Sequence, residues 1–140
     1  MRVLGTVALG LLTSISLMGG VSAADFDGSK PFVCALLELT SCERGSDCEI
    51  ETPASANVPR FLFIDAPKNS IAGTRPSGKS LTTTIARQQT LGDLLVLDGA
   101  EDALSWTVTV NRTTGDMTLG VVGDKVGFVV FGECARGSAN

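Results

Sequence analysis

The sequence has neither histidine nor tyrosine among its 140 residues, and this lack excludes several kinds of catalytic site. Histidine is the base of Ser-His-Asp and Cys-His nucleophile systems, a common zinc ligand and the usual general base near neutral pH. Only carboxylates and hydroxyls remain for acid–base chemistry. No nucleophile system, metal-ligand set or cofactor loop is evident in what is left. The sequence therefore predicts a protein that is not an enzyme, with no catalytic residues, no metal and no cofactor.

Basic residues are also few. Lysine and arginine total 11 against 15 aspartates and glutamates, which gives a net charge of −4. The basic residues are scattered and form no positive stripe of the kind that binds a phosphate backbone. We therefore expect neither nucleic acid nor anionic lipid as a partner, and we expect the acidity to favour solubility.

The amino terminus has the pattern of a secretory leader. Arg2 precedes an uncharged apolar run over residues 3–18, and small residues precede Ala24, as in a signal peptide with its cleavage site. The run is shorter than the roughly 20 residues of a membrane-spanning helix, and no basic stop-transfer cluster follows it. We expect residues 1–23 to be removed and residues 24–140 to form one periplasmic or secreted domain without a membrane span.

The segment from residue 94 to 134 contains four short apolar runs separated by turn residues. Within it, Trp106, Val108 and Val110 alternate with polar residues, the period-two pattern of a strand with one apolar face. Gly115 supplies a residue that tolerates positive φ where the chain must reverse. These features predict an antiparallel meander.

The preceding part of the mature chain also favours strands. We expect them at residues 60–64, 70–72, 81–87 and, less clearly because Ala, Leu and Glu favour helix, at 32–42. Residues 24–30 are polar and expected to be frayed, and the stretch 43–59, rich in Gly, Ser and Pro, is expected to be a surface loop.

Seven or eight short strands with regularly spaced turns indicate an all-β domain. A sheet of this size with one apolar face must close on itself or split into two layers. Sequential hairpins favour closure. We predict a small antiparallel up-and-down barrel, a meander of the lipocalin type, with a β-sandwich as the alternative.

Four cysteines in an exported domain of this size predict two disulfides. Three pairings are possible. Cys42 and Cys48 enclose a short polar loop, which makes their bond the easiest to close. Cys34 then pairs with Cys134 and joins the first strand to the last. Neither CxxC spacing nor another metal or redox pattern occurs.

One stretch matches a phosphate-binding motif. Residues 73–80, GTRPSGKS, fit G-x-x-x-x-G-K-[ST], and an apolar run ending in Asp98 follows. Such a site needs a helix that starts at the lysine, whereas residues 81–85 form a β-branched run that favours a strand. We interpret the stretch as a hairpin turn and nucleotide hydrolysis as the least favoured hypothesis. Arg75 and Lys79 remain weak candidates for contact with an anion.

The carboxylates and the single tryptophan are the other candidates. Glu101 and Asp102, together with the acids between residues 43 and 51, lack EF-hand spacing and are expected to be solvated. Trp106 could stack on a ligand in a barrel mouth, although a lone tryptophan is more often part of the core. It is the third weak candidate for ligand binding.

Several segments resemble a group of small exported proteins of Gram-negative bacteria that are uncharacterised in function. The resemblance is carried by PFVC, VPRFLFID, GTRPSG, SWTVTV followed by TTGDM, and the closing GFVVFGEC with its Phe-Gly-x-Cys strand. It implies a periplasmic β domain and transfers no catalytic residue. A small disulfide-closed barrel is also similar in plan to periplasmic lysozyme inhibitors.

The leading hypothesis is thus an exported, non-catalytic binding module for a protein or a small ligand of unknown identity. A periplasmic inhibitor of the lysozyme-inhibitor type is one alternative. A hydrolase that uses carboxylates alone is another, and it requires two of Asp98, Glu101 and Asp102 to face each other across a concave site.

The leader hypothesis makes a direct prediction. When the full sequence is expressed in a Gram-negative host, the mature protein should begin at Ala24, because signal peptidase cleaves after small residues in this context. Intact mass and amino-terminal sequencing of the periplasmic fraction test this. An uncleaved chain retained in the cytoplasm would contradict it.

Overall fold

The computed structural model describes residues 25–137, so the leader expected at residues 1–23 lies outside the described residues. The described part contains nine strands and one short 3-10 helix, η1. In chain order they are β1 (Phe32–Glu43), β2 (Glu49–Glu51), β3 (Phe61–Asp65), η1 (Ala66–Lys68), β4 (Ser70–Thr74), β5 (Ser80–Leu91), β6 (Leu94–Glu101), β7 (Leu104–Asn111), β8 (Asp116–Val122) and β9 (Val126–Arg136).

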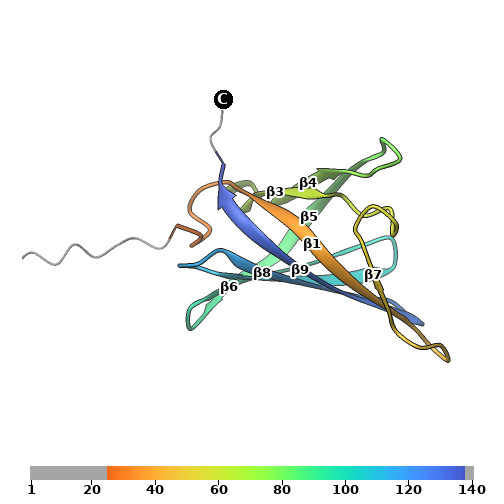
Figure 1. Ribbon diagram of the computed structural model, residues 1–140. Coiled ribbons are helices and arrows are strands. Elements are labelled where there is room, and N and C mark those ends of the chain that lie inside the picture. The colour runs from red at the N-terminus through yellow and green to blue at the C-terminus, as the bar shows by residue number, and fades with distance from the viewer. Residues whose placement is uncertain (1–24, 138–140) are drawn as a thin grey trace, which may run out of the picture.

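The strands form a closed antiparallel barrel (Figure 1). From β3 to β9 each strand pairs with the next along the chain, and β1 pairs with both β3 and β9. The prediction of an all-β up-and-down barrel is confirmed, and the sandwich alternative is wrong. Closure removes the unpaired edges that an open sheet of this length would expose.

Strand β1 is the seam of the barrel. One of its edges pairs with β9 from Phe32 to Glu43, while the other pairs first with β3 and then with the short strand β2. A bulge at Leu37 shifts the register, so that Leu36 and Leu39 both face the interior and Leu37 is exposed. The segment is a strand throughout, although its Ala, Leu and Glu residues favour helix.

One end of the barrel is closed by residues that precede β1. Phe26 is buried there and packs edge-to-face against Phe32, with ring centroids 5.5 Å apart. Its amide donates to the carbonyl of Arg112 at 3.1 Å. The expectation that residues 24–30 are frayed is therefore wrong for the described part of that segment. The side chain of Phe26 anchors this otherwise polar segment to the core.

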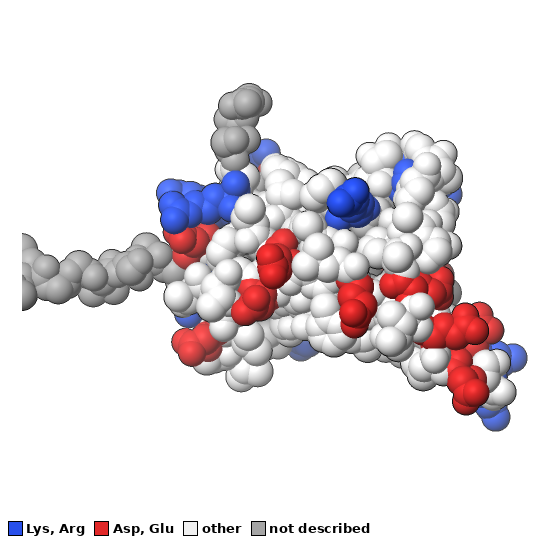
Figure 2. Space-filling model, in the orientation of Figure 1, with Lys and Arg blue, Asp and Glu red and all other residues white. Residues whose placement is uncertain are grey.

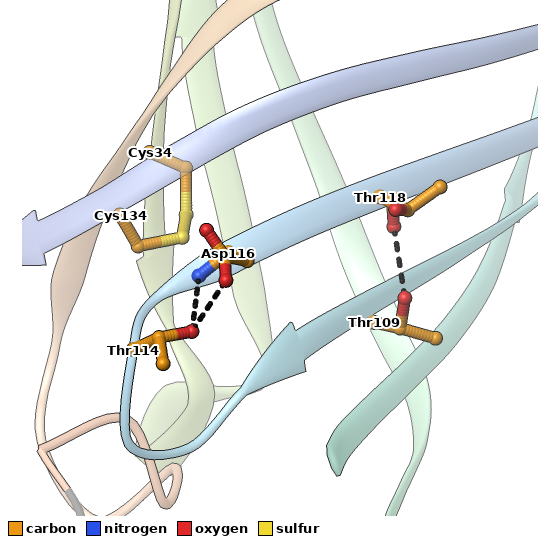
Figure 3. The surroundings of a disulfide bond; sticks show 6 residues. All are labelled: Cys34, Thr109, Thr114, Asp116, Thr118 and Cys134. Carbon is orange, nitrogen blue, oxygen red and sulfur yellow. Dashed lines mark hydrogen bonds between the residues drawn. A yellow bond between two sulfur atoms is a disulfide. The ribbon is translucent and has the colours of Figure 1, made fainter.

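Both predicted disulfides are present. Cys34 and Cys134 are paired residues on β1 and β9, and their bond lies inside the barrel (Figure 3). Cys42 and Cys48 close the loop between β1 and β2. Cys134 lies within β9 rather than just beyond the last strand, because β9 continues to Arg136.

The segment that matches a phosphate-binding motif is a hairpin turn between β4 and β5. The Gly78 amide donates to the carbonyl of Arg75 at 2.8 Å, and the Arg75 amide donates to the carbonyl of Lys79 at 2.9 Å. Gly78 has a φ of 83°, which a glycine adopts without steric cost. Strand β5 begins at Ser80, where a nucleotide site would need a helix. The interpretation as a turn is confirmed.

The two disulfides should differ in their effect on stability. Replacing Cys34 and Cys134 by alanine should lower the free energy of unfolding by about 4 to 5 kcal/mol, because the bond closes a loop of about 100 residues in the unfolded chain. Replacing Cys42 and Cys48 should lower it by only about 2 kcal/mol, since that loop is short. Guanidinium unfolding of the two double variants measures both values. An equal or larger loss in the Cys42/Cys48 variant would contradict this assignment.

Candidate functional site

The barrel interior is hollow at one end. The cavity there has a volume of about 270 Å³, and most of its lining is apolar. The wall is made by inward-facing side chains of the barrel strands, which include Leu36, Leu62, Ile71, Trp106, Leu119 and Phe128. Residues Ala56, Val58 and Pro59 of the loop before β3 also contribute. Concave apolar cavities with a few polar groups at the edge are the usual form of small-ligand sites.

The side chain of Trp106 lies against the barrel wall at Gly99 and forms part of the cavity lining. The inward-facing positions of β6 are Leu95, Leu97, Gly99 and Glu101, and Gly99 pairs with Trp106 on β7. A Cβ atom at Gly99 would overlap Cζ2 of the indole. Because Gly99 has no side chain, the indole can lie against the backbone of β6. The centre of the barrel mouth then stays open.

The backbone pairing of two wall strands ends early at this end. Strands β5 and β6 pair from Leu91 and Leu94 as far as Ile85 and Gly99, and their pairing stops there. Figure 1 shows the β4–β5 and β6–β7 hairpins diverging beyond this point. The indole Nε1 of Trp106 donates to Oγ1 of Thr83 at 3.2 Å, which links the two sides. The cavity is lined by residues of both hairpins and lies at the end of the barrel where they diverge, which we call the mouth.

One side of the mouth carries a fixed guanidinium. Arg75 is half-buried, lines the cavity and donates from Nη1 to the carbonyl of Asn57 at 3.1 Å. The amide of Ser77 donates to Oδ1 of the same asparagine at 3.2 Å. Asn57 thus joins the loop before β3 to the β4–β5 turn and holds Arg75 in place.

The other side of the mouth carries two carboxylates. Glu101 is half-buried at the last inward-facing position of β6, and Asp102 is exposed in the turn that follows. Asp102 and Ala103 have φ values of 48° and 63°, so both residues of this tight hairpin turn are left-handed. Within residues 25–137, neither carboxylate has a lysine or arginine nitrogen within 4.0 Å.

The structure separates the three weak candidates for ligand contact. Trp106 and Arg75 both line the cavity. Lys79 is exposed on the β4–β5 turn and does not line it. Asp102 is exposed and Glu101 is half-buried, and both also border the cavity, which the sequence did not indicate. Their place at the mouth follows from the alternation of β6 once Gly99 is recognised as an inward-facing position.

Asp98, the third acid of the hydrolase hypothesis, does not line the cavity. It accepts a hydrogen bond from Oγ1 of Thr107 at 2.7 Å, and its other oxygen lies 2.9 Å from Nη2 of Arg87. The hydrogen bond from Thr107 is the main cause that lowers the pKa of Asp98, with a further contribution from Arg87. Asp98 is held as a carboxylate between neighbouring strands and does not face Glu101 or Asp102.

The acids between residues 43 and 51 lie at the β1–β2 hairpin, and most of them are exposed. Across residues 25–137 no group of three or more Cys, Asp or Glu side chains is placed to hold a metal ion. The same residues contain no helix of the length and apolar character that crossing a bilayer requires.

No family model, curated protein or solved structure matches this chain. The resemblance to small exported proteins of Gram-negative bacteria therefore stays a prediction.

The contact between Gly99 and Trp106 can be tested with two alanine variants. Gly99→Ala should lower the free energy of unfolding by about 1 to 3 kcal/mol and shift the emission of Trp106, because the new methyl group must displace the indole. Gly120→Ala is the matched control, since a Cβ on that strand glycine meets nothing within 4 Å. Denaturant unfolding followed by tryptophan fluorescence measures both effects. Equal behaviour of the two variants would contradict the packing described.

Proposed function

We propose that this protein is an exported, non-catalytic binding module that takes a small, mainly apolar molecule into the hollow end of its barrel. The cavity beside Trp106 is the observation that supports this most strongly. Phe26 and the Cys34–Cys134 disulfide fill the opposite end. The two ends of the interior therefore differ, and only the end beside Trp106 offers space to a ligand.

The volume of the cavity sets the size of the ligand. An apolar cavity of about 150 Å³ holds benzene, so a cavity of about 270 Å³ has room for roughly ten non-hydrogen atoms. Transfer of such a molecule from water to the apolar wall is favourable because each buried methylene contributes about 0.8 kcal/mol. An alkyl chain of about eight carbons or a small aromatic system fits this limit.

The proposed location is the periplasm or the extracellular space. The leader pattern at residues 1–23 supports export. Two disulfides in the described residues agree with an oxidising compartment. A small domain that must persist outside the cytoplasm benefits from both bonds.

The alternatives have less support. A hydrolase of the two-carboxylate type needs acids on opposite sides of a cleft, whereas Glu101 and Asp102 are neighbours on one hairpin and Asp98 does not line the cavity. Inhibition of a lysozyme-like enzyme has only the general plan of the barrel in its favour.

Two phenylalanine variants on β8 test the proposal. Val121 lines the cavity, whereas its neighbour Val122 is 61% exposed on the outer face. Val121→Phe should fill part of the cavity and weaken binding of 1-octanol at least tenfold, and Val122→Phe should bind as the parent does. Trp106 is the only tryptophan and no tyrosine is present, so its fluorescence reports on the cavity alone.

Titration with 1-octanol should give a saturable change in Trp106 emission and raise the melting temperature of the parent, since a ligand that binds only the folded state stabilises it. Melting curves of both variants establish that they are folded. If neither 1-octanol nor its charged analogues change emission or melting of the parent, the proposed function is wrong.

A further inference from the structure

We propose that the ligand is a small organic cation, with its apolar part in the cavity and an ammonium group at the carboxylates of Glu101 and Asp102. This inference rests on the proposed function and specifies the chemistry of the ligand. It follows from the charges around the mouth and from which of them already have partners within the protein.

Glu101 is the charged group directed most clearly at the cavity. It follows Leu95, Leu97 and Gly99 on the inward-facing side of β6, and it is half-buried. A carboxylate at the edge of an apolar cavity attracts a positively charged group of a ligand. Among residues 25–137 no lysine or arginine nitrogen lies within 4.0 Å of this carboxylate. A ligand ammonium would supply the missing partner.

Asp102 adds a second negative charge on the same side of the mouth. It is the next residue in the chain and also borders the cavity. Its left-handed backbone and that of Ala103 make a two-residue turn, which brings Leu104 back along Glu101 as its paired residue on β7. This tight turn places the backbone of both acidic residues at the same edge of the cavity.

Arg75 has a structural role on the opposite side. Its guanidinium donates to the carbonyl of Asn57 and helps to hold the loop before β3 against the β4–β5 turn. With Arg75 included, the cavity lining still carries one more negative than positive charge. The whole chain is acidic as well, with a net charge of −4, and Figure 2 shows more acidic than basic side chains on the face formed by β1 and β9. Such a field attracts cations and repels anions.

A matched series of eight-carbon probes tests the sign of the charge. Octylammonium, 1-octanol and octanoate share the apolar chain and differ in the head group. At neutral pH and low salt, octylammonium should bind about tenfold more tightly than 1-octanol, and octanoate should bind more weakly than either. Raising the salt to 0.5 M should reduce the preference for the cation severalfold, because salt screens charges at an open mouth. Trp106 fluorescence, checked by calorimetry, measures the three affinities.

Charge-neutral variants assign the preference to residues. Glu101→Gln and Asp102→Asn should each reduce the ratio of octylammonium to 1-octanol affinity at least threefold, and the double variant should bring that ratio close to one. Glu133→Gln is the matched control, because it removes the same charge from an exposed position of β9 outside the cavity lining. It should leave the ratio unchanged.

The outcomes separate this inference from the proposed function. If 1-octanol binds and octanoate binds as tightly as octylammonium or more tightly, the cavity is a binding site but the assignment of a cation is wrong. The same conclusion follows if Glu133→Gln lowers the ratio as much as Glu101→Gln does. If none of the three probes binds, the proposed function itself fails.

Discussion

The pairing of β1 with β9, fastened inside the barrel by Cys34 and Cys134, is the constraint on which the remaining structure depends. These two strands are the most distant in the sequence, so bringing them together costs the most chain entropy. The disulfide lowers that cost by restricting the unfolded chain. Once the seam is closed, every barrel strand has two neighbours and one side of each faces a common interior. Without closure the same side chains would line an open sheet and enclose no cavity.

The two ends of that interior are finished differently, and this difference connects the packing to the proposed function. At one end the segment before β1 turns inward and Phe26 completes the core. At the other end β5 and β6 separate after Gly99, and the indole of Trp106 lies along the wall over that glycine. The ring of Phe26 therefore fills one end of the interior, whereas the indole of Trp106 borders the cavity at the other end. The acidic rim at Glu101 lies at the end that stays open.

Much of the barrel could be predicted because its signals are local. Alternation over residues 106–110 and the turn at Gly115 determine a hairpin without reference to the rest of the chain. The short loop between Cys42 and Cys48 predicted their disulfide, and Cys34 and Cys134 were then the remaining pair. The bulge at Leu37 was not predictable, because it depends on how β1 meets two partners at once. The strand expected at residues 81–87 continues as β5 to Leu91, because β6 pairs with this polar part.

The open cavity was harder to predict than the strands. Gly99 and Trp106 indicate it only when their cross-strand pairing is known.

The central claim is that the β1–β9 seam holds the barrel closed around its cavity, and native-state amide hydrogen exchange tests it most directly. The amides that join β1 to β9 should be among the slowest in the described residues to exchange, opening only with global unfolding. Reduction of the Cys34–Cys134 disulfide should accelerate exchange along both strands. Fast exchange of the seam in the oxidised protein, while β6, β7 and β8 stay protected, would contradict the account.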